Sequence, residues 1–420
     1  MNKTKKLISA FLGLIISITL ASNLICAEET NAALLYQDGV SLLEKLFSTV
    51  KGKIEKIIQE GWRTDNQDVK EYLVRNEKAI NKFKEASKLN YCDFTSGKEI
   101  KNTIESEIPK YGEMVKLAKL TIVEARLFEK EGKLDAALDN YLAVLRFISH
   151  LEQQKRFVLL SKLVGMRVQK LLFKPLSCYI NQNKLSREIY HTLLSVLIFL
   201  RNNETGLKSA FKEEKENMRD MKKMFMVQAK ERGLHNQEFY QKFCSEFDKL
   251  VDEFYGYLIT AFEENNPRYY EEKITQFRKK LEKETKPLNL AQDILRAGIS
   301  KNAPSLSAKI LVSLYMPSFF KAITKYYVSL AELNILITAS AIKLYEMDEG
   351  RLPDRLEDLV PKYIPQVFKD PFNNFKPLTY RKTKKGWIIY SFGPDKKDDL
   401  GKVEYDYKKL TKGDIMFSSF

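Results

Sequence analysis

The sequence predicts a mostly α-helical protein, a helical bundle or irregular α-solenoid, that ends in a small C-terminal α+β domain. From Glu29 to about Lys301, apolar residues recur three or four positions apart, which is the spacing of one face of an amphipathic helix. Beyond Gly350, short apolar runs alternate with turn residues, which is typical of short strands. The 420 residues allow two or three domains, and a hydrophobic content of 44% is sufficient for a buried core.

Residues 1–27 are interpreted as a signal peptide or an N-terminal anchor. Three lysines precede an apolar run from Leu7 to Leu20, and Cys26-Ala27 offers a cleavage site. The apolar stretch is also about long enough to cross a bilayer uncleaved. Lipidation of Cys26 ranks third, because the residues before it are not the small ones that a lipobox requires. A cleaved signal ranks first, and we expect an exported protein.

Residues 28–300 are predicted to form an all-α domain. Its first helices are expected at Asn31–Thr49, Val69–Leu89, 109–132, Lys155–Asn181 and Ser186–Asn202. Gly206–Thr285 adds two long amphipathic helices that turn near Gly233, and Pro267 can occupy the first turn of another. The Met and Phe stripe of these helices is interpreted as core contact, ahead of the alternative of a partner-binding face.

Residues 114–147 carry the pattern of a helical hairpin. It consists of a small turn residue, Gly132, and small or apolar residues at Leu134, Ala137, Tyr141 and Leu145. In this spacing the stretch resembles one tetratricopeptide repeat. A continuous core needs about three such units, and no second copy is found at that period. An irregular bundle or solenoid with one hairpin of this type is therefore preferred to a repeat array.

Residues 307–420 are predicted to form a long helix and a small antiparallel sheet, after a joint at Asn302–Ser307. Gly350 suits the left-handed end of the helix, and Pro353 prevents its continuation. The later elements are expected at Glu357–Val360 (a helical turn), at Leu378–Arg381 and Trp387–Ser391 (two strands), and after Asp414 (a last strand). The side chains expected on the helix-facing side of the sheet are Tyr380, Trp387, Ile389 and Phe417.

An ordered series of motifs follows the long helix: DEGRLPDRLEDLVPKYI, KDPFNNFKPLTYR, WIIYSFGPDKKDD and GDIMF. Over the last fifth of the chain this series resembles the C-terminal region of the major pseudopilins of type II secretion. It is also similar to exported bacterial proteins that carry this module behind a long helical region. The pseudopilin leader, which ends in Gly before Phe-Thr-Leu-Ile-Glu, does not precede Phe319 or begin the chain, so assembly by the usual pseudopilin route is not expected.

One loop near the C-terminus carries a candidate calcium site. The candidate ligands are Asp395, Asp398, Asp399 and Asp414. Carboxylate oxygens suit a hard cation, and an ion would stabilise a small sheet that has little core. The pseudopilin resemblance implies calcium at the same four positions. Lys396 and Lys397 inside the loop oppose a cation, and the alternative is a solvated acidic turn.

Catalytic motifs are not found in the sequence. The histidines (His150, His191 and His235) and the cysteines beyond residue 27 (Cys92, Cys178 and Cys244) are widely spaced and interpreted as structural or surface residues. Phosphate-binding loops and nucleophile elbows are not found either. A net charge of +15, with 70 basic and 55 acidic residues, indicates a basic surface of mixed sign. No compact arginine cluster with interleaved aromatic residues occurs, so a nucleic-acid partner is not expected.

The chain is therefore predicted to be an exported, non-enzymatic binding or scaffolding protein of the cell envelope, periplasmic or anchored by its N-terminus, with protein partners. The alternative is an accessory component of a type II secretion or pilus-like system, recruited through the C-terminal domain. An uncharacterised enzyme is the third interpretation.

Overall fold

The computed structural model describes residues 30–420 apart from several segments. The segments left out are 46–47, 64–65, 97–108, 157, 183–184, 232–236, 264–266, 286–302 and 408–411. The predicted signal or anchor at 1–27, the turn at Gly233 and His235 lie outside the described residues.

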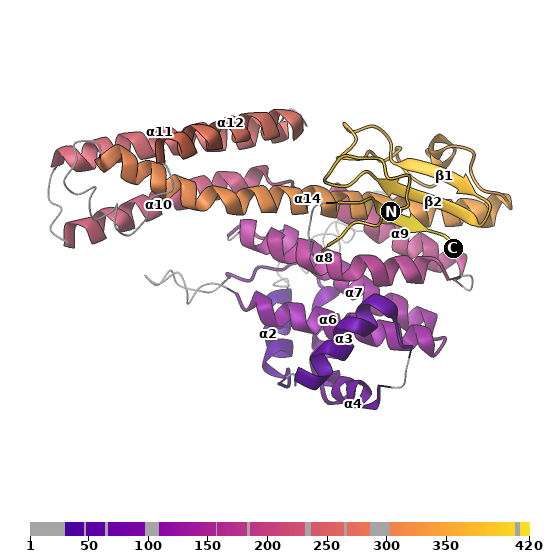
Figure 1. The fold of residues 1–420 in the computed structure, drawn as a ribbon. Coiled ribbons are helices and arrows are strands. Elements are labelled where there is room, and N and C mark those ends of the chain that lie inside the picture. The colour runs from indigo at the N-terminus through magenta and orange to yellow at the C-terminus, as the bar shows by residue number, and fades with distance from the viewer. Residues whose placement is uncertain are drawn as a thin grey trace, which may run out of the picture.

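Helices make up most of the described chain, and a small sheet lies near its end (Figure 1). The helices are α2 (Ala32–Ser41), α3 (Ser48–Glu60), α4 (Gln67–Arg75), α5 (Glu77–Ser87), α6 (Tyr111–Lys130), α7 (Leu134–Glu152), α8 (Val158–Ile180), α9 (Arg187–Asn202), α10 (Lys208–Glu231), α11 (Gln237–Glu263), α12 (Pro267–Thr285), α14 (Ala303–Glu349) and the 3-10 turn η2 (Leu356–Leu359). The strands are β1 (Thr379–Thr383), β2 (Gly386–Ser391) and β3 (Ile415–Ser418). A mostly helical fold with a small C-terminal sheet is thus confirmed.

Helices α2 to α9 form the N-terminal body (Figure 1). Its centre is an aromatic cluster in which the ring of Tyr36 lies 4.9 Å from that of Phe147 and 5.2 Å from that of Phe83. The hairpin predicted around Gly132 is formed by α6 and α7, and Gly132 takes a left-handed conformation (φ +74°) between them. This glycine lets the chain reverse in a short connection.

Two helices predicted as continuous are broken, which corrects those predictions. The helix expected over Asn31–Thr49 ends at Ser41, and the next begins at Ser48. The helix expected over Val69–Leu89 is interrupted at Asn76. The buried amide of Asn76 donates to the carbonyl of Tyr72 (2.8 Å) and accepts from the backbone N–H of Glu44 (2.9 Å). A side chain that bonds the local backbone competes with the helix, which explains the break.

Helices α10, α11 and α12 extend away from the body along the N-terminal part of α14 (Figure 1). Many apolar side chains of this arm are buried between its helices, although Met224 and Val227 of α10 are exposed. Buried members include Phe211, Met218, Phe243, Phe247, Leu250 and Phe254. The interpretation of the stripe as core contact is confirmed for these residues.

Helix α14 is 47 residues long and belongs to both parts of the molecule. It begins at Ala303, so the joint predicted at Asn302–Ser307 is wrong: Pro304 lies in the first helical turn, where its missing N–H costs no hydrogen bond. Its segment Lys321–Glu349 is long and apolar enough to cross a membrane, but this segment is almost wholly buried by protein, as in a core helix. Gly350 ends it with φ +64°, as predicted.

The sheet packs on the C-terminal part of α14 (Figure 1). Its order is β1-β2-β3 and all pairs are antiparallel, with Tyr380 opposite Ile389 and Ile389 opposite Phe417. The rings of Trp387 and Phe417 stack at 5.2 Å, and the Lys343 ammonium of α14 lies 6.0 Å from the Trp387 ring. On its other side α14 contacts α8 and α9. The helical body and the C-terminal sheet therefore share one core helix.

Candidate functional site

The acidic loop folds back onto the start of β3. The Asp414 carboxylate accepts from the backbone N–H of Gly401 (2.8 Å) and of Asp399 (3.5 Å). The Asp398 carboxylate accepts from the Tyr390 hydroxyl (2.9 Å) and from a backbone N–H in the loop. Burial raises the pKa of Asp414 to about 6, with a further contribution from the negative charges of Asp399 and Asp398.

Two of the predicted ligands, Asp398 and Asp399, lie close enough to Asp414 for their charges to raise its pKa. The fourth, Asp395, accepts from Lys397 N–H (3.3 Å) within its own turn. The oxygen donors suit a hard cation, which would also relieve the negative potential at Asp414. Yet nowhere in the described chain are three or more His, Cys, Asp or Glu side chains placed to hold a metal ion together. Calcium binding stays a prediction.

The described histidines and cysteines do not form a reactive pair. His150 is buried, its Nδ1 lies 3.0 Å from the Tyr36 hydroxyl, and its Nε2 lies 2.8 Å from the Leu89 carbonyl oxygen. Burial lowers the pKa of His150 and raises that of Cys92, which keeps both groups neutral. Their environment is that of core residues.

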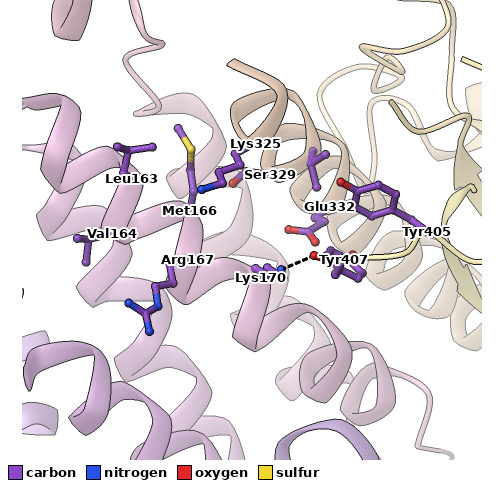
Figure 2. Close-up of a pocket in the computed structure, with 11 residues that line it drawn as sticks. Leu163, Val164, Met166, Arg167, Lys170, Lys325, Ser329, Glu332, Tyr405 and Tyr407 are labelled. Atoms are coloured by element: carbon purple, nitrogen blue, oxygen red, sulfur yellow. Dashed lines mark hydrogen bonds between the residues drawn. The ribbon is translucent and has the colours of Figure 1, made fainter. Parts of the chain in front are cut away.

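A cavity of about 460 Å³ lies between α8, α14 and the segment that ends at Tyr407. Its two ends differ in character, as Figure 2 shows. One end is apolar and is formed by Leu163 and Val164 of α8. The other end is polar and is formed by Glu332 of α14 with Tyr405 and Tyr407. A volume of this size is typical of a small-molecule site.

Three buried polar atoms meet at the polar end. Glu332 is only 1% exposed, and its Oε1 atom has no hydrogen-bond partner among the described residues. The hydroxyl groups of Tyr405 and Tyr407 likewise have no hydrogen-bond partner in the described parts of the chain, although the Tyr407 hydroxyl lies close enough to Glu332 to lower the pKa of that carboxyl group. Burial raises the pKa of Glu332 to about 7, although Tyr407 and Lys170 lie close enough to favour its charged form. The carboxyl group is therefore near the midpoint of its titration at neutral pH.

Lys170 holds the C-terminal segment against α8. Its ammonium donates to the carbonyl of Tyr407 (2.9 Å), as drawn in Figure 2, and lies 5.2 Å from the centre of the Tyr407 ring. Partial burial lowers the pKa of Lys170, the Lys325 charge lowers it further, and Glu332 opposes the change. The Lys170 ammonium thus lies at the polar end of the cavity, near the buried Glu332 carboxyl group.

The Tyr405–Tyr407 segment is positioned by the residues before β3. The N–H of Tyr405 donates to the carbonyl of Asp414 (2.9 Å). Gly413 makes this approach feasible, because it has φ +97° and a Cβ atom there would lie 2.6 Å from the Glu404 carbonyl oxygen. Asp414 therefore contacts the cavity segment through its backbone and the acidic loop through its side chain.

Sequence analysis did not predict the cavity. One signal was available: Glu332 is a single acidic residue within the long apolar run of α14. The residues that surround it come from distant positions, Lys170 in α8 and Tyr407 near the C-terminus, and no sequence spacing links them. Only the packing of three elements identifies the site.

Comparison of the chain with protein families, with curated proteins and with solved structures finds no match in any of the three.

Proposed function

We propose that this chain is an exported, non-enzymatic binding protein of the cell envelope, and that the cavity between α8, α14 and Tyr405–Tyr407 is its ligand site. The observation that carries the proposal is the group of buried polar atoms at one end of this cavity. A buried polar atom without a partner costs about 1–3 kcal/mol. A ligand with matching polar groups would provide those partners, and its apolar part would be covered by the other end.

Binding is favoured over catalysis by the composition of the lining. The described lining includes no histidine or cysteine that could act as a base or nucleophile. One carboxyl group, lysines, an arginine and tyrosines can orient an acid or a polar group without reacting with it. An enzyme that uses Glu332 as its general acid or base is the third interpretation, and a turnover of bound ligand would support it.

Export is supported by the sequence of residues 1–27, and the excess of basic over acidic residues suits a protein that works beside anionic envelope surfaces.

The alternative function, an accessory part of a type II secretion or pilus-like system, is supported by the pseudopilin-like motifs around β1, β2 and β3. Co-purification with secretion proteins through the C-terminal sheet would favour this alternative. In either case we propose calcium as a structural ion of the loop, with Asp398, Asp399 and Asp414 as ligands; Asp395, which is held in its own turn, would have to turn toward them to complete the predicted set.

A cavity-blocking variant tests the proposal. Val164→Trp places a large ring in the apolar end, and Val227→Trp makes the same substitution at an exposed position of α10. A library of small envelope metabolites is screened for compounds that raise the unfolding temperature of the purified protein. We expect compounds that stabilise the wild type and Val227→Trp but not Val164→Trp. The proposal is wrong if no compound separates the two variants.

A further inference from the structure

The cavity has the charge pattern of a site for an anion. Its lining contains the cationic side chains of Arg167, Lys170 and Lys325 and a single acidic side chain, Glu332. The acidic Glu404 at the edge of the segment is engaged with Lys174 of α8 (3.7 Å). Even with Glu332 ionised, the lining is positive, so an anionic group is attracted and a cationic one is repelled.

The distribution of polar groups fixes the orientation of a ligand. Figure 2 shows Lys170, Glu332 and Tyr407 gathered at one end, with Leu163 and Val164 at the other. A ligand that satisfies both ends carries one acid group and an unbranched or compact apolar part. Its acid oxygens can accept from the ammonium and from tyrosine hydroxyls.

On the premise that the cavity is the ligand site of the proposed function, we propose that it binds a small amphipathic carboxylic acid. The acid group lies at the end formed by Lys170, Glu332 and Tyr407, and the apolar part lies along Leu163 and Val164. A carboxylate carries a single charge, so it can approach the buried Glu332 at a lower desolvation cost than a doubly charged phosphate.

Binding of such an acid is coupled to the uptake of one proton. Two carboxyl groups at hydrogen-bond distance cannot both be ionised in a buried site, so one proton is shared between the ligand and Glu332. The charged and titratable groups of the cavity around Glu332 are Arg167 and Lys170 from α8, Lys325 from α14, and Glu404, Tyr405, Asp406 and Tyr407 from the C-terminal segment. The lysines favour the bound anion, and the two acids of the segment oppose it.

Titration calorimetry of the purified protein with octanoate tests this inference. The octanoate carboxyl group, like that of a glutamate side chain, is ionised at both pH 6 and pH 8. Because the pKa of Glu332 is about 7, we expect the affinity to fall about tenfold from pH 6 to pH 8. Glu332→Gln removes that dependence and binds octanoate at pH 8 as tightly as the wild type does at pH 6. Each methylene removed from the chain weakens binding about fourfold.

Two comparisons make the test specific. Octylamine and 1-octanol share the apolar chain and should bind at least tenfold more weakly than octanoate at pH 6. Lys325→Gln should weaken octanoate binding severalfold, whereas Lys321→Gln, one turn earlier on α14 and outside the lining, should not. The inference is overturned if octanoate does not bind, if octylamine or 1-octanol binds as well, or if the pH dependence persists in Glu332→Gln.

The outcome separates this inference from the proposed function. If octanoate fails but other compounds stabilise the wild type and not Val164→Trp, the ligand class is wrong and the cavity is still the ligand site. If no compound separates Val164→Trp from its control, the cavity itself is not a ligand site and both proposals fail.

Discussion

Replacing Glu332 with glutamine should change how stability depends on pH. The pKa of this carboxyl group is about 7 in the folded protein, and its ordinary value is 4.5. Because the pKa is higher in the folded protein than in the unfolded chain, protonation of Glu332 favours the folded state, and this stabilisation is fully present below pH 4.5. The stabilisation is lost as the pH rises through 7. At about 1.4 kcal/mol for each unit of pKa difference, the loss is about 3 kcal/mol between pH 4.5 and pH 8.

The free energy of unfolding of Glu332→Gln, relative to that of the wild type, should therefore increase with pH. Relative to the wild type, Glu332→Gln should gain about 3 kcal/mol in the free energy of unfolding between pH 4.5 and pH 8. Urea unfolding at several pH values measures this change, with the fluorescence of the two buried tryptophans, Trp62 and Trp387, as the probe. All other titrating groups are common to both proteins, so their contributions cancel in the difference.

Glu346→Gln is the matched control, because Glu346 lies on the same helix with a side chain that is 43% exposed. Its difference from the wild type should stay within about 0.5 kcal/mol at every pH. A pH-independent difference for Glu332→Gln would refute the reasoning, since it would mean that this carboxyl group has the same pKa in the folded and unfolded chains.

Three further predictions concern the loop, the cavity segment and the helical body. If calcium binds the acidic loop, the ion should raise the unfolding temperature, and a chelator should reverse this rise. The double substitution Asp398→Ala, Asp399→Ala should abolish the rise, and an equal rise in that variant would exclude the loop as the calcium site. Gly413→Ala should lower stability by about 1–3 kcal/mol in urea unfolding, because its Cβ would meet the Glu404 carbonyl oxygen at 2.6 Å; an unchanged midpoint would contradict the geometry. Asn76→Ala should cost about 1–3 kcal/mol by the same assay, because it removes the two hydrogen bonds of this side chain, to the Glu44 N–H and the Tyr72 carbonyl, at about 0.5–1.5 kcal/mol each; a neutral result would show that the helix break does not need this side chain.

The sequence predicted the elements whose signals are local. The apolar period identified α6, α7, α8 and α9, and glycine or proline chemistry placed their ends and the end of α14 at Gly350. The predicted ends of β1 and β2 and the predicted start of β3 lie within two residues of the observed ones. The signal there is local, because runs that contain tyrosine, tryptophan and isoleucine are bounded by turns. The break at Asn76 was missed, because its cause is a hydrogen bond to Glu44, a residue of another segment.

The candidate site could be predicted only in part, for a related reason. Asp398 and Asp399 lie near Asp414 because Asp414 precedes β3, and β3 pairs with β2, the strand before the loop. The cavity depends on how α8 crosses α14 and on where Lys170 meets the Tyr407 carbonyl. Such contacts follow from the packing of whole elements, and a single sequence does not encode them in any spacing.

Helix α14 connects the two candidate sites to the rest of the molecule. One face of it carries Glu332 at the cavity, and its C-terminal part supports the sheet through Trp387. The cavity is closed by Tyr405–Tyr407, which belongs to the C-terminal region and is tied to Asp414. Removing the sheet would therefore open the cavity as well as expose α14. A C-terminal region that acted only as an appended adaptor would leave the cavity of the body intact, whereas here this region forms one of the cavity walls, which favours the proposed ligand-binding role for the chain as a whole.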